Sequence, residues 1–505
     1  MGADRPPAGR ADPMAILVAD VERLLAEATT RLGIDTGPLL ARFRAPLTVA
    51  VAGRTNAGKS TLVNALIGHR IAPTRATECT RVVTWFRYGA QEAAWVVCRR
   101  EPGAPTDTDR LVRPLWLTAD QTLPDELGVP VDQVDRVEVR RSYEPLERVE
   151  VIDTPGLFGD EGLAAHTEQL LADEAADVLL FVCGRTLTDY EVQVLTTFRK
   201  NGTRLYDFPG NVLGVLNRAD LHGADGDRRR RGDHDYVWAA ATECAAAHAR
   251  VLADQVSGVC PVIGKIAEST ESGGFGARHA DWLRTLARVD PERRVDALFD
   301  ADEFAELDCE VPIPDRRTLV DRLGMHGIRV LSGSIDQHTS AAAMHDHLRA
   351  MSGIAALRAR IVTMFLRPAA VHKTVRALAD LSAIAATSPF TATDRAWLDD
   401  AVGALRRSPP MHTLAELRAL AALFSGRCVL PEPMRQNAVR MLSGTDPVAR
   451  LGVSADSASA LAETALEAAN WWTRVSNSAT DPQVRMLADT AAWSAELIYD
   501  AWRQR

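Results

Sequence analysis

The residues best suited to chemistry lie in an eight-residue stretch, GRTNAGKS, that runs from Gly53 to Ser60. Its spacing fits GxxxxGK[ST], in which glycines let backbone N–H groups converge on phosphate oxygens at the positive end of a helix. Lys59 would neutralise the β- and γ-phosphates of a nucleotide, and the Ser60 hydroxyl would coordinate Mg²⁺. We therefore predict that this loop binds a nucleotide. The residues that we assign to it are Gly53, Asn56, Ala57, Gly58, Lys59, Ser60 and Thr61.

Two later motifs predict that the nucleotide is GTP. The sequence DTPG places Asp153 where it would hold the magnesium shell, and Gly156 where its N–H would contact the γ-phosphate. The sequence NRAD begins at Asn217 and fits NKxD, with Arg218 in place of lysine; the guanidinium plane can stack on a base. The Asp220 carboxylate can accept two hydrogen bonds from guanine, whereas adenine would leave it buried and unpaired.

A weaker motif, Ile263-Gly264-Lys265, stands where guanine-nucleotide proteins carry Ser-Ala-Lys and contact the base through the backbone. We assign Gly264 and Lys265 to the nucleotide on this basis. The chain has only four lysines, Lys59, Lys200, Lys265 and Lys373, and is otherwise rich in arginine and alanine. This bias is typical of a GC-rich bacterial gene. Because lysine is rare in such a chain, the presence of Lys265 in the motif supports the assignment of that motif.

The sequence leaves open which residue positions the water that attacks the γ-phosphate. Leu157 follows the DTPG motif, where small signalling GTPases carry a glutamine, and leucine cannot hydrogen-bond to water. The candidates are Asn56, the backbone of Thr80, and a residue from a second molecule paired through its GTPase face. Arg54 is either a built-in arginine finger or an exposed arginine of the loop.

Thr80 also fits the threonine that would coordinate Mg²⁺ only when the γ-phosphate is present, because an alternating strand pattern follows it at once; Thr77 is the alternative. The predicted metal ligands are Ser60, Thr80 and Asp153. The catalytic candidates are Asn56, Thr80, Lys59 and Arg54.

Short apolar runs that are suited to buried strands must position these motifs. A helical pattern follows the phosphate loop, and a second occurs at 188–200, so the alternation predicts an α/β fold with a mostly parallel sheet, a P-loop GTPase domain. Inserts are expected at 90–148, with two or three strands, and at 270–350, helical near both ends. The predicted core strands lie within 45–53, 149–156, 176–184, 211–220 and 259–268.

Both ends of the chain predict helices. Residues 14–32 carry an apolar stripe that includes Leu17, Val21 and Leu24 and that needs an apolar surface to cover it. From 367 to 505 only helical patterns occur, which predicts an α-helical bundle that helix 14–32 joins as part of a stalk. The Trp471/Trp472 pair fits core packing better than lipid insertion.

Composition limits the partners and the location of the chain. The net charge of -9 and pI near 5.8 argue against binding nucleic acid through bulk positive charge. No apolar run approaches the roughly 18 residues that span a bilayer, and no signal peptide is visible in the Pro-rich opening. We therefore expect a cytoplasmic protein that does not bind nucleic acid.

Together these stretches resemble the bacterial dynamin-like GTPases, and most of all the isoniazid-inducible dynamin-like proteins of mycobacteria and related actinobacteria, in the shorter type without a transmembrane segment. The likeness is strong over about 45–185 and weaker through 319–331 and 352–365. It departs at Arg218, at Ile263, and at Asn56, where dynamins carry a catalytic serine.

This resemblance implies a division of the chain into a disordered lead-in at 1–13, N-terminal helices at 14–44, a dynamin-type GTPase domain at 45–366 and a helical stalk at 367–505. It also implies Mg²⁺-dependent hydrolysis of GTP to GDP and phosphate, activated when GTPase faces pair in a homodimer. The implied role is membrane remodelling or maintenance, with peripheral attachment at the inner membrane face or through a membrane-anchored dynamin-like partner.

Two alternatives remain. An Era-like ribosome-assembly GTPase would carry an RNA-binding tail, but 367–505 holds 15 Lys/Arg and 14 Asp/Glu and lacks a recognisable RNA-binding motif. A scaffold that binds GTP with little turnover is compatible with Leu157.

Overall fold

The structure is a computed structural model of the chain. The predictions for Thr77 and Leu157, and most of the lead-in, lie outside the residues that it describes. Those residues are 12–73, 78–99, 111–156, 176–202, 208–223, 233–336, 338–454 and 457–503.

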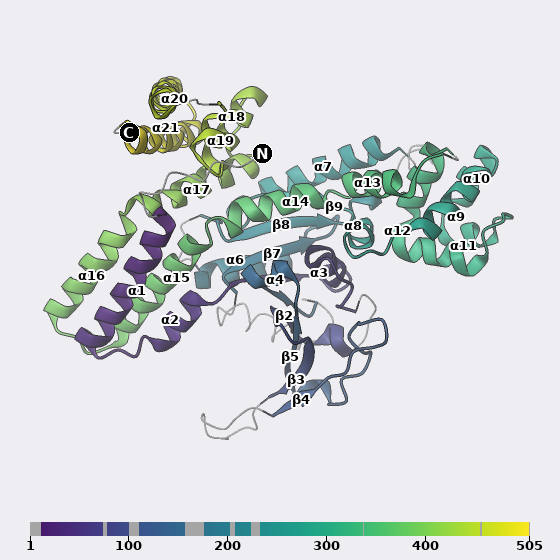
Figure 1. Cartoon of the computed structure of the whole chain (residues 1–505), viewed down its shortest axis with the longest axis horizontal. Helices are drawn as coiled ribbons and strands as arrows, with labels where there is room; N and C mark the ends of the chain where they lie inside the picture. Colours follow the sequence, from purple (N-terminus) through teal and green to yellow (C-terminus); the bar gives the residue numbers. More distant parts are fainter. Residues whose placement is uncertain are drawn as a thin grey trace. The chain divides into compact units, whose positions relative to one another are not determined.

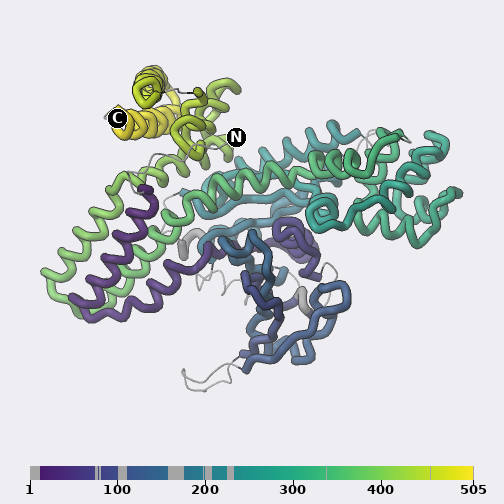
Figure 2. The backbone as a smooth tube through the Cα atoms, viewed as in Figure 1, coloured from purple at the N-terminus to yellow at the C-terminus, as the bar shows by residue number. Residues whose placement is uncertain are grey.

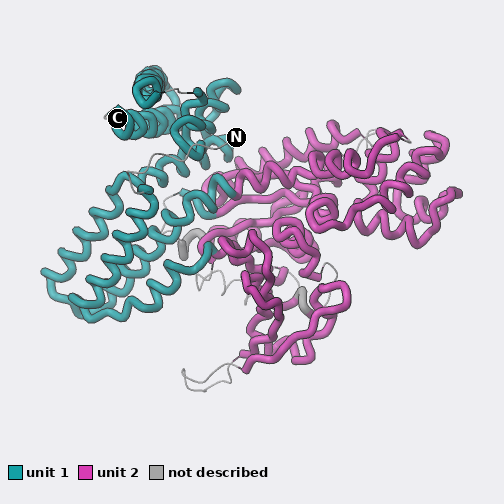
Figure 3. Tube along the Cα trace, in the orientation of Figure 1, with its two compact units in different colours: residues 1–47, 202–211, 362–505 teal, residues 48–201, 212–361 magenta. Residues whose placement is uncertain are grey.

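The chain folds into two compact units, which Figure 3 shows in different colours. The sheet unit comprises residues 48–201 and 212–361. The helical unit comprises residues 1–47, 202–211 and 362–505. The short segment 202–211 belongs to the helical unit, although it is flanked in sequence by two stretches of the sheet unit. No sequence pattern predicted this assignment.

A nine-stranded sheet forms the centre of the sheet unit within the described residues, with the order β4-β3-β5-β2-β6-β1-β7-β8-β9. Its strands are β1 Leu47–Gly53, β2 Thr84–Tyr88, β3 Ala93–Cys98, β4 Val112–Pro114, β5 Val134–Arg141, β6 Val149–Asp153, β7 Val178–Cys183, β8 Val212–Asn217 and β9 Val259–Val262.

The central strands are parallel and apolar. Val51 of β1 pairs with Leu180 of β7, which pairs in turn with Leu213 of β8, and every residue of these three strands is buried. Antiparallel pairing joins β2 to β6 and joins β3 to β4 and β5. The predicted mostly parallel α/β fold is therefore confirmed. Because carboxyl ends of parallel strands meet at one edge, the loops after β1 and β8 lie together.

Helices cover this sheet and join its strands. They include α3 Lys59–Ile67, which follows the phosphate loop, and α8 Gly264–Glu271, which follows β9 (Figure 1). Gly68 ends α3 in a left-handed conformation, as a C-terminal glycine should. The others are α4 Glu144–Arg148, α6 Asp189–Gly202, α7 His234–Val251 and α14 Ile354–Ile361.

The segment 90–148 contains β3, β4 and β5, in agreement with the two or three strands predicted. The expectation for 270–350 was wrong in part, because helices run through the whole segment rather than near its two ends. They are α9 Ala277–Ala287, α10 Pro291–Ala297, α11 Ala301–Glu306, α12 Ile313–Ser334 and α13 Ala341–Met351. Two of them are too short to show a helical period, and they are held by one apolar cluster that includes Leu283, Phe304 and Leu319.

In the helical unit, α1 (Pro13–Leu32) lies beside α15 (Ala369–Thr387) and α16 (Ala392–Arg406), as Figure 2 shows at its purple and green ends. The predicted stripe of α1 is buried, which explains how an orphan helix finds an apolar surface. Lys373 of α15 is also buried, and its ammonium donates to the Arg42 carbonyl at 3.2 Å. Arg42 belongs to α2, Gly37–Arg44.

The C-terminal part of the helical unit is also helical. Trp472 is buried at 1% exposure, which confirms core packing for this residue. No helix among the described residues is both long and apolar enough to cross a membrane. The helices are α17 Thr413–Phe424, α18 Glu432–Ser443, α19 Pro447–Leu451, α20 Ala458–Ser478 and α21 Pro482–Trp502, with a π-helical turn at Val362–Leu366 before α15.

Truncation of Leu17 should destabilise the helical unit. Leu17 is 1% exposed, so Leu17→Ala would leave a cavity and lower the free energy of unfolding by about 2–5 kcal/mol. Its neighbour Ile16 is 46% exposed, and Ile16→Ala should change that free energy by less than about 0.5 kcal/mol. Urea unfolding followed by far-UV circular dichroism measures both. Equal shifts in the two variants would contradict the packing of α1.

Candidate functional site

The phosphate loop leaves β1 at Gly53 and enters α3 at Lys59. Asn56 (φ 62°) and Gly58 (φ 87°) both adopt left-handed conformations, which turn the loop sharply before the helix starts. The Lys59 ammonium lies inside the loop and donates to the carbonyl oxygens of Gly53 (3.2 Å) and Arg54 (3.0 Å). Burial lowers the pKa of Lys59, and the nearby Asp153 carboxylate opposes that shift. The lysine is thus fixed within the loop by backbone carbonyls.

Ser60 and Asp153, two of the predicted metal ligands, are in direct contact. The Ser60 hydroxyl donates to Asp153 Oδ2 at 2.7 Å. Burial raises the pKa of Asp153 to about 6, against the opposing effects of Lys59 and the Ser60 hydrogen bond. Its second oxygen, Oδ1, is buried and accepts no hydrogen bond from the described residues. A buried, unpartnered carboxylate oxygen beside a hydroxyl fits the hard oxygen ligands that Mg²⁺ prefers.

The DTPG motif packs directly against the phosphate loop. A Cβ placed on Gly156 would overlap the backbone and hydroxyl of Thr55, so this close approach requires glycine. The third predicted ligand, Thr80, lies in a short 3₁₀ helix, Glu78–Arg81, whose backbone alone is described at that position.

Asn217 joins the phosphate loop to the loops that would bind the base. Its amide nitrogen donates to the carbonyls of Ala57 (2.8 Å) and Gly58 (3.2 Å). Its amide oxygen accepts from the backbone N–H groups of Arg218 (2.8 Å) and Gly264 (3.0 Å). One buried side chain therefore holds three separate segments in register.

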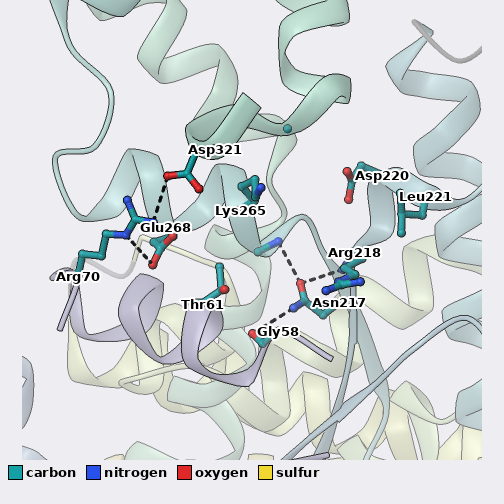
Figure 4. A pocket seen from close by; sticks show the side chains of 12 residues that line it. Gly58, Thr61, Arg70, Asn217, Arg218, Asp220, Leu221, Lys265, Glu268 and Asp321 are labelled. Carbon is teal, nitrogen blue, oxygen red and sulfur yellow. Dashed lines mark hydrogen bonds and ion pairs between the residues drawn. The ribbon is translucent and has the colours of Figure 1, made fainter. Parts of the chain in front are cut away.

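Asp220, Arg218 and Lys265 line one end of a cavity of about 410 Å³, with Gly58 and Thr61 at the phosphate loop (Figure 4). Burial raises the pKa of Asp220, while its own backbone hydrogen bond and the cations of Lys265 and Arg218 oppose that shift. Charge from both cations thus favours the carboxylate form, which guanine would require. The structure brings together the base-binding residues that the sequence predicted.

The other catalytic candidates differ in exposure. Asn56 is exposed, and Arg54 is half-buried. Leu157 and Thr77 lie outside the described residues, so the group that positions water stays a prediction.

Five residues that no motif indicated line the same cavity. They are Arg70, Leu221, Glu268, Asp321 and Gly324. Arg70 follows α3, Leu221 directly follows Asp220, and Glu268 lies in α8. Asp321 and Gly324 lie in α12, within the predicted insert 270–350. A signal that could have found them is the pair Gly324 and Gly327 inside a helical pattern, since a glycine there marks a special backbone conformation or a close approach.

Comparison with known proteins gives consistent similarities. Residues 49–219 match the Dynamin family. Isoniazid-induced protein IniC of Mycobacterium tuberculosis, in strains CDC 1551 / Oshkosh and ATCC 25618 / H37Rv, is 32% identical over 480 residues, or 91% of this chain and 91% of that protein. A solved structure of an oligomerised bacterial dynamin pair, described as sensing and tethering membranes, is 13% identical. It covers 98% of this chain and 77% of that chain with a TM-score of 0.32, which is too low to carry a conclusion.

Removal of the Ser60 hydroxyl should weaken the metal site. Ser60→Ala deletes one oxygen ligand, so we expect the Mg²⁺ concentration needed for half-maximal GTP hydrolysis to rise by about tenfold or more. The measurement is a Mg²⁺ titration of phosphate release. Ser382→Ala, which deletes a hydroxyl that bonds within α15, is the control. An unchanged Mg²⁺ requirement in Ser60→Ala would refute this assignment.

The Asp220→Asn variant should change base preference. An asparagine amide loses two charge-assisted acceptor contacts with guanine but can donate to the 2-carbonyl of xanthine. We expect GDP affinity to fall about tenfold or more, and affinity for xanthosine diphosphate to rise. Competition of both nucleotides against a fluorescent analogue measures the ratio. If that ratio stays at the wild-type value, Asp220 does not read the base.

Proposed function

The chain belongs to the dynamin family, and from that premise we propose that it binds GTP with Mg²⁺ and hydrolyses it to GDP and phosphate. The observation that carries this proposal is the position of Asn217, whose side chain bonds to the phosphate loop and to both base loops. Gly58 and Thr61 of the phosphate loop and the proposed guanine-binding residues Arg218, Asp220 and Lys265 therefore line one cavity.

Binding would divide between the residues of this cavity and those of the adjoining phosphate loop. Lys59 and the backbone N–H groups of the loop would bind the phosphates, and Asp220 would select guanine while Arg218 stacks on it. Ser60, Asp153 and Thr80 would hold Mg²⁺, which when bound neutralises charge on the phosphate oxygens. The Gly156 N–H would contact the γ-phosphate from the loop that packs on Thr55.

Hydrolysis needs a water oxygen to attack the γ-phosphorus while the bond to the β-phosphate oxygen breaks and GDP leaves. We propose that pairing of two GTPase faces activates this step. Two features support the idea: Thr55 and Asn56 are exposed on the phosphate loop, and Leu157 offers no polar atom to water. Asn56, the Thr80 backbone and Arg54 are the candidates within one chain.

We further propose that the cycle serves membrane remodelling or maintenance from the cytoplasmic side of the inner membrane. Membership of the dynamin family supports this role. Attachment would be peripheral, either directly to lipid or through a membrane-anchored dynamin-like partner.

Activity should depend on protein concentration. If paired faces complete the site, GTP turnover per molecule should rise several-fold as the protein is concentrated or mixed with anionic vesicles, since both favour pairing. Phosphate release measured across a concentration series, with and without vesicles, tests this expectation. Lys59→Ala, which removes the cation of the phosphate loop, should stay inactive throughout. A low rate that is constant across the series would contradict activation by pairing.

A further inference from the structure

Three charged residues line the nucleotide cavity without a role in binding phosphate or base. Arg70 forms ion pairs with two carboxylates, Nε with Glu268 Oε1 at 3.7 Å and Nη2 with Asp321 Oδ2 at 3.3 Å. In Figure 4 this Arg70–Glu268–Asp321 cluster lies on the opposite side of Lys265 from Asp220. The cluster therefore faces the part of the cavity that lies away from the base-binding carboxylate.

The cluster is held by backbone contacts behind it. Glu268 Oε1 accepts from the Asn64 amide nitrogen at 2.7 Å. The Asn64 amide oxygen accepts in turn from the N–H groups of Ile71 (3.0 Å) and Ala72 (2.9 Å). The Glu268 side chain is only 5% exposed, whereas that of Asp321 is 44% exposed. Glu268 is thus anchored in place, and Asp321 is the carboxylate with room to meet a ligand.

The backbone of α12 places Asp321 in this wall. Gly324 (φ 66°) interrupts the helix, and the turn frees carbonyl groups that dock on α8. The Val320 carbonyl accepts from the Lys265 ammonium at 3.3 Å, and the Arg322 carbonyl accepts from the Ser269 hydroxyl at 2.5 Å. A Cβ on Gly324 would lie 3.9 Å from Asp220 Oδ2. One turn of α12 therefore runs from the base end of the cavity to Asp321.

We propose that this turn of α12 forms the ribose-facing wall of the nucleotide site, and that Asp321 accepts a hydrogen bond from a ribose hydroxyl. The inference rests on the proposed binding of GTP. A nucleotide with its base at Asp220 and its α-phosphate at Gly58 and Thr61 would place its ribose in this cavity, and the Arg70–Glu268–Asp321 cluster is the charged part of the lining that neither base nor phosphate uses.

The chemistry of the two partners matches. Ribose hydroxyls are donors and carboxylates are acceptors, the pairing by which an acidic residue binds the ribose in dinucleotide-binding folds. Asp321 Oδ2 is occupied by Arg70, whereas Oδ1 accepts no hydrogen bond from the described residues. The ion pair with Arg70 limits the motion of the Asp321 side chain. The site should therefore prefer ribonucleotides over nucleotides that lack these hydroxyls.

Binding of GDP and of 2′,3′-dideoxy-GDP, measured by isothermal titration calorimetry on the full chain, tests the proposal. For the wild-type protein we expect dideoxy-GDP to bind about tenfold more weakly, because a hydrogen bond to a charged group is lost. For Asp321→Ala the two affinities should become nearly equal, since the variant already lacks that bond. The 2′-deoxy and 3′-deoxy forms then identify the hydroxyl.

Asp315→Ala is the matched control. Asp315 lies in the same helix and also pairs with one arginine, Arg278 at 3.3 Å, but it does not line the cavity. This variant should keep the wild-type preference for GDP. Equal binding of both nucleotides to the wild-type protein would overturn the ribose contact and leave GTP binding intact. If Asp321→Ala weakens GDP and dideoxy-GDP binding by the same factor, Asp321 has a merely structural role. If the wild-type protein does not bind GDP at all, both the proposed GTP binding and the ribose contact are overturned.

Discussion

The four hydrogen bonds of the Asn217 side chain are the constraint on which the nucleotide site depends. They connect the phosphate loop after β1, the turn after β8 and the start of α8, three segments that the sheet brings to one edge. A buried amide that uses both its donor and its acceptor side is expensive to disrupt, because any displaced partner is left unpaired. Close approaches at Gly58 and Gly264 leave no space for a Cβ beside this amide.

Each charged group of the site has an opposite charge nearby. Lys59 lies near Asp153, Lys265 and Arg218 lie near Asp220, and Arg70 lies between Glu268 and Asp321. Burial lowers the pKa of Lys59 and raises the pKa values of Asp153, Asp220 and Glu268, and the opposite charge near each of these four groups opposes that shift. The charges of the site are therefore compensated within the protein itself.

The sequence was sufficient to predict the residues of the site that belong to short local motifs. Asp153 and Asn217 each end a strand, the phosphate loop and Asp220 come shortly after one, and their motifs need only a few consecutive residues to be seen. The apolar stripe of α1 could be predicted for the same reason, because its residues repeat at helical spacing within one short segment. Asp321 was not, because it meets Arg70 across 251 positions of sequence and depends on a break in α12. The short helices of 270–350 escaped detection because a shared core, rather than their own periodicity, holds them.

The scarcity of lysine gives this fold an unusual chemical sensitivity. Three of the four lysines, Lys59, Lys265 and Lys373, use their ammonium groups on backbone carbonyls, and one of them, Lys265, lines the cavity. The remaining basic side chains that carry a permanent charge are arginines, which do not react as free amines and stay protonated in proteins. Acylation would therefore not be spread over a basic surface. Lys59 and Lys373 are buried, whereas acylation of Lys265 would remove a cation from the wall of the cavity near Asp220.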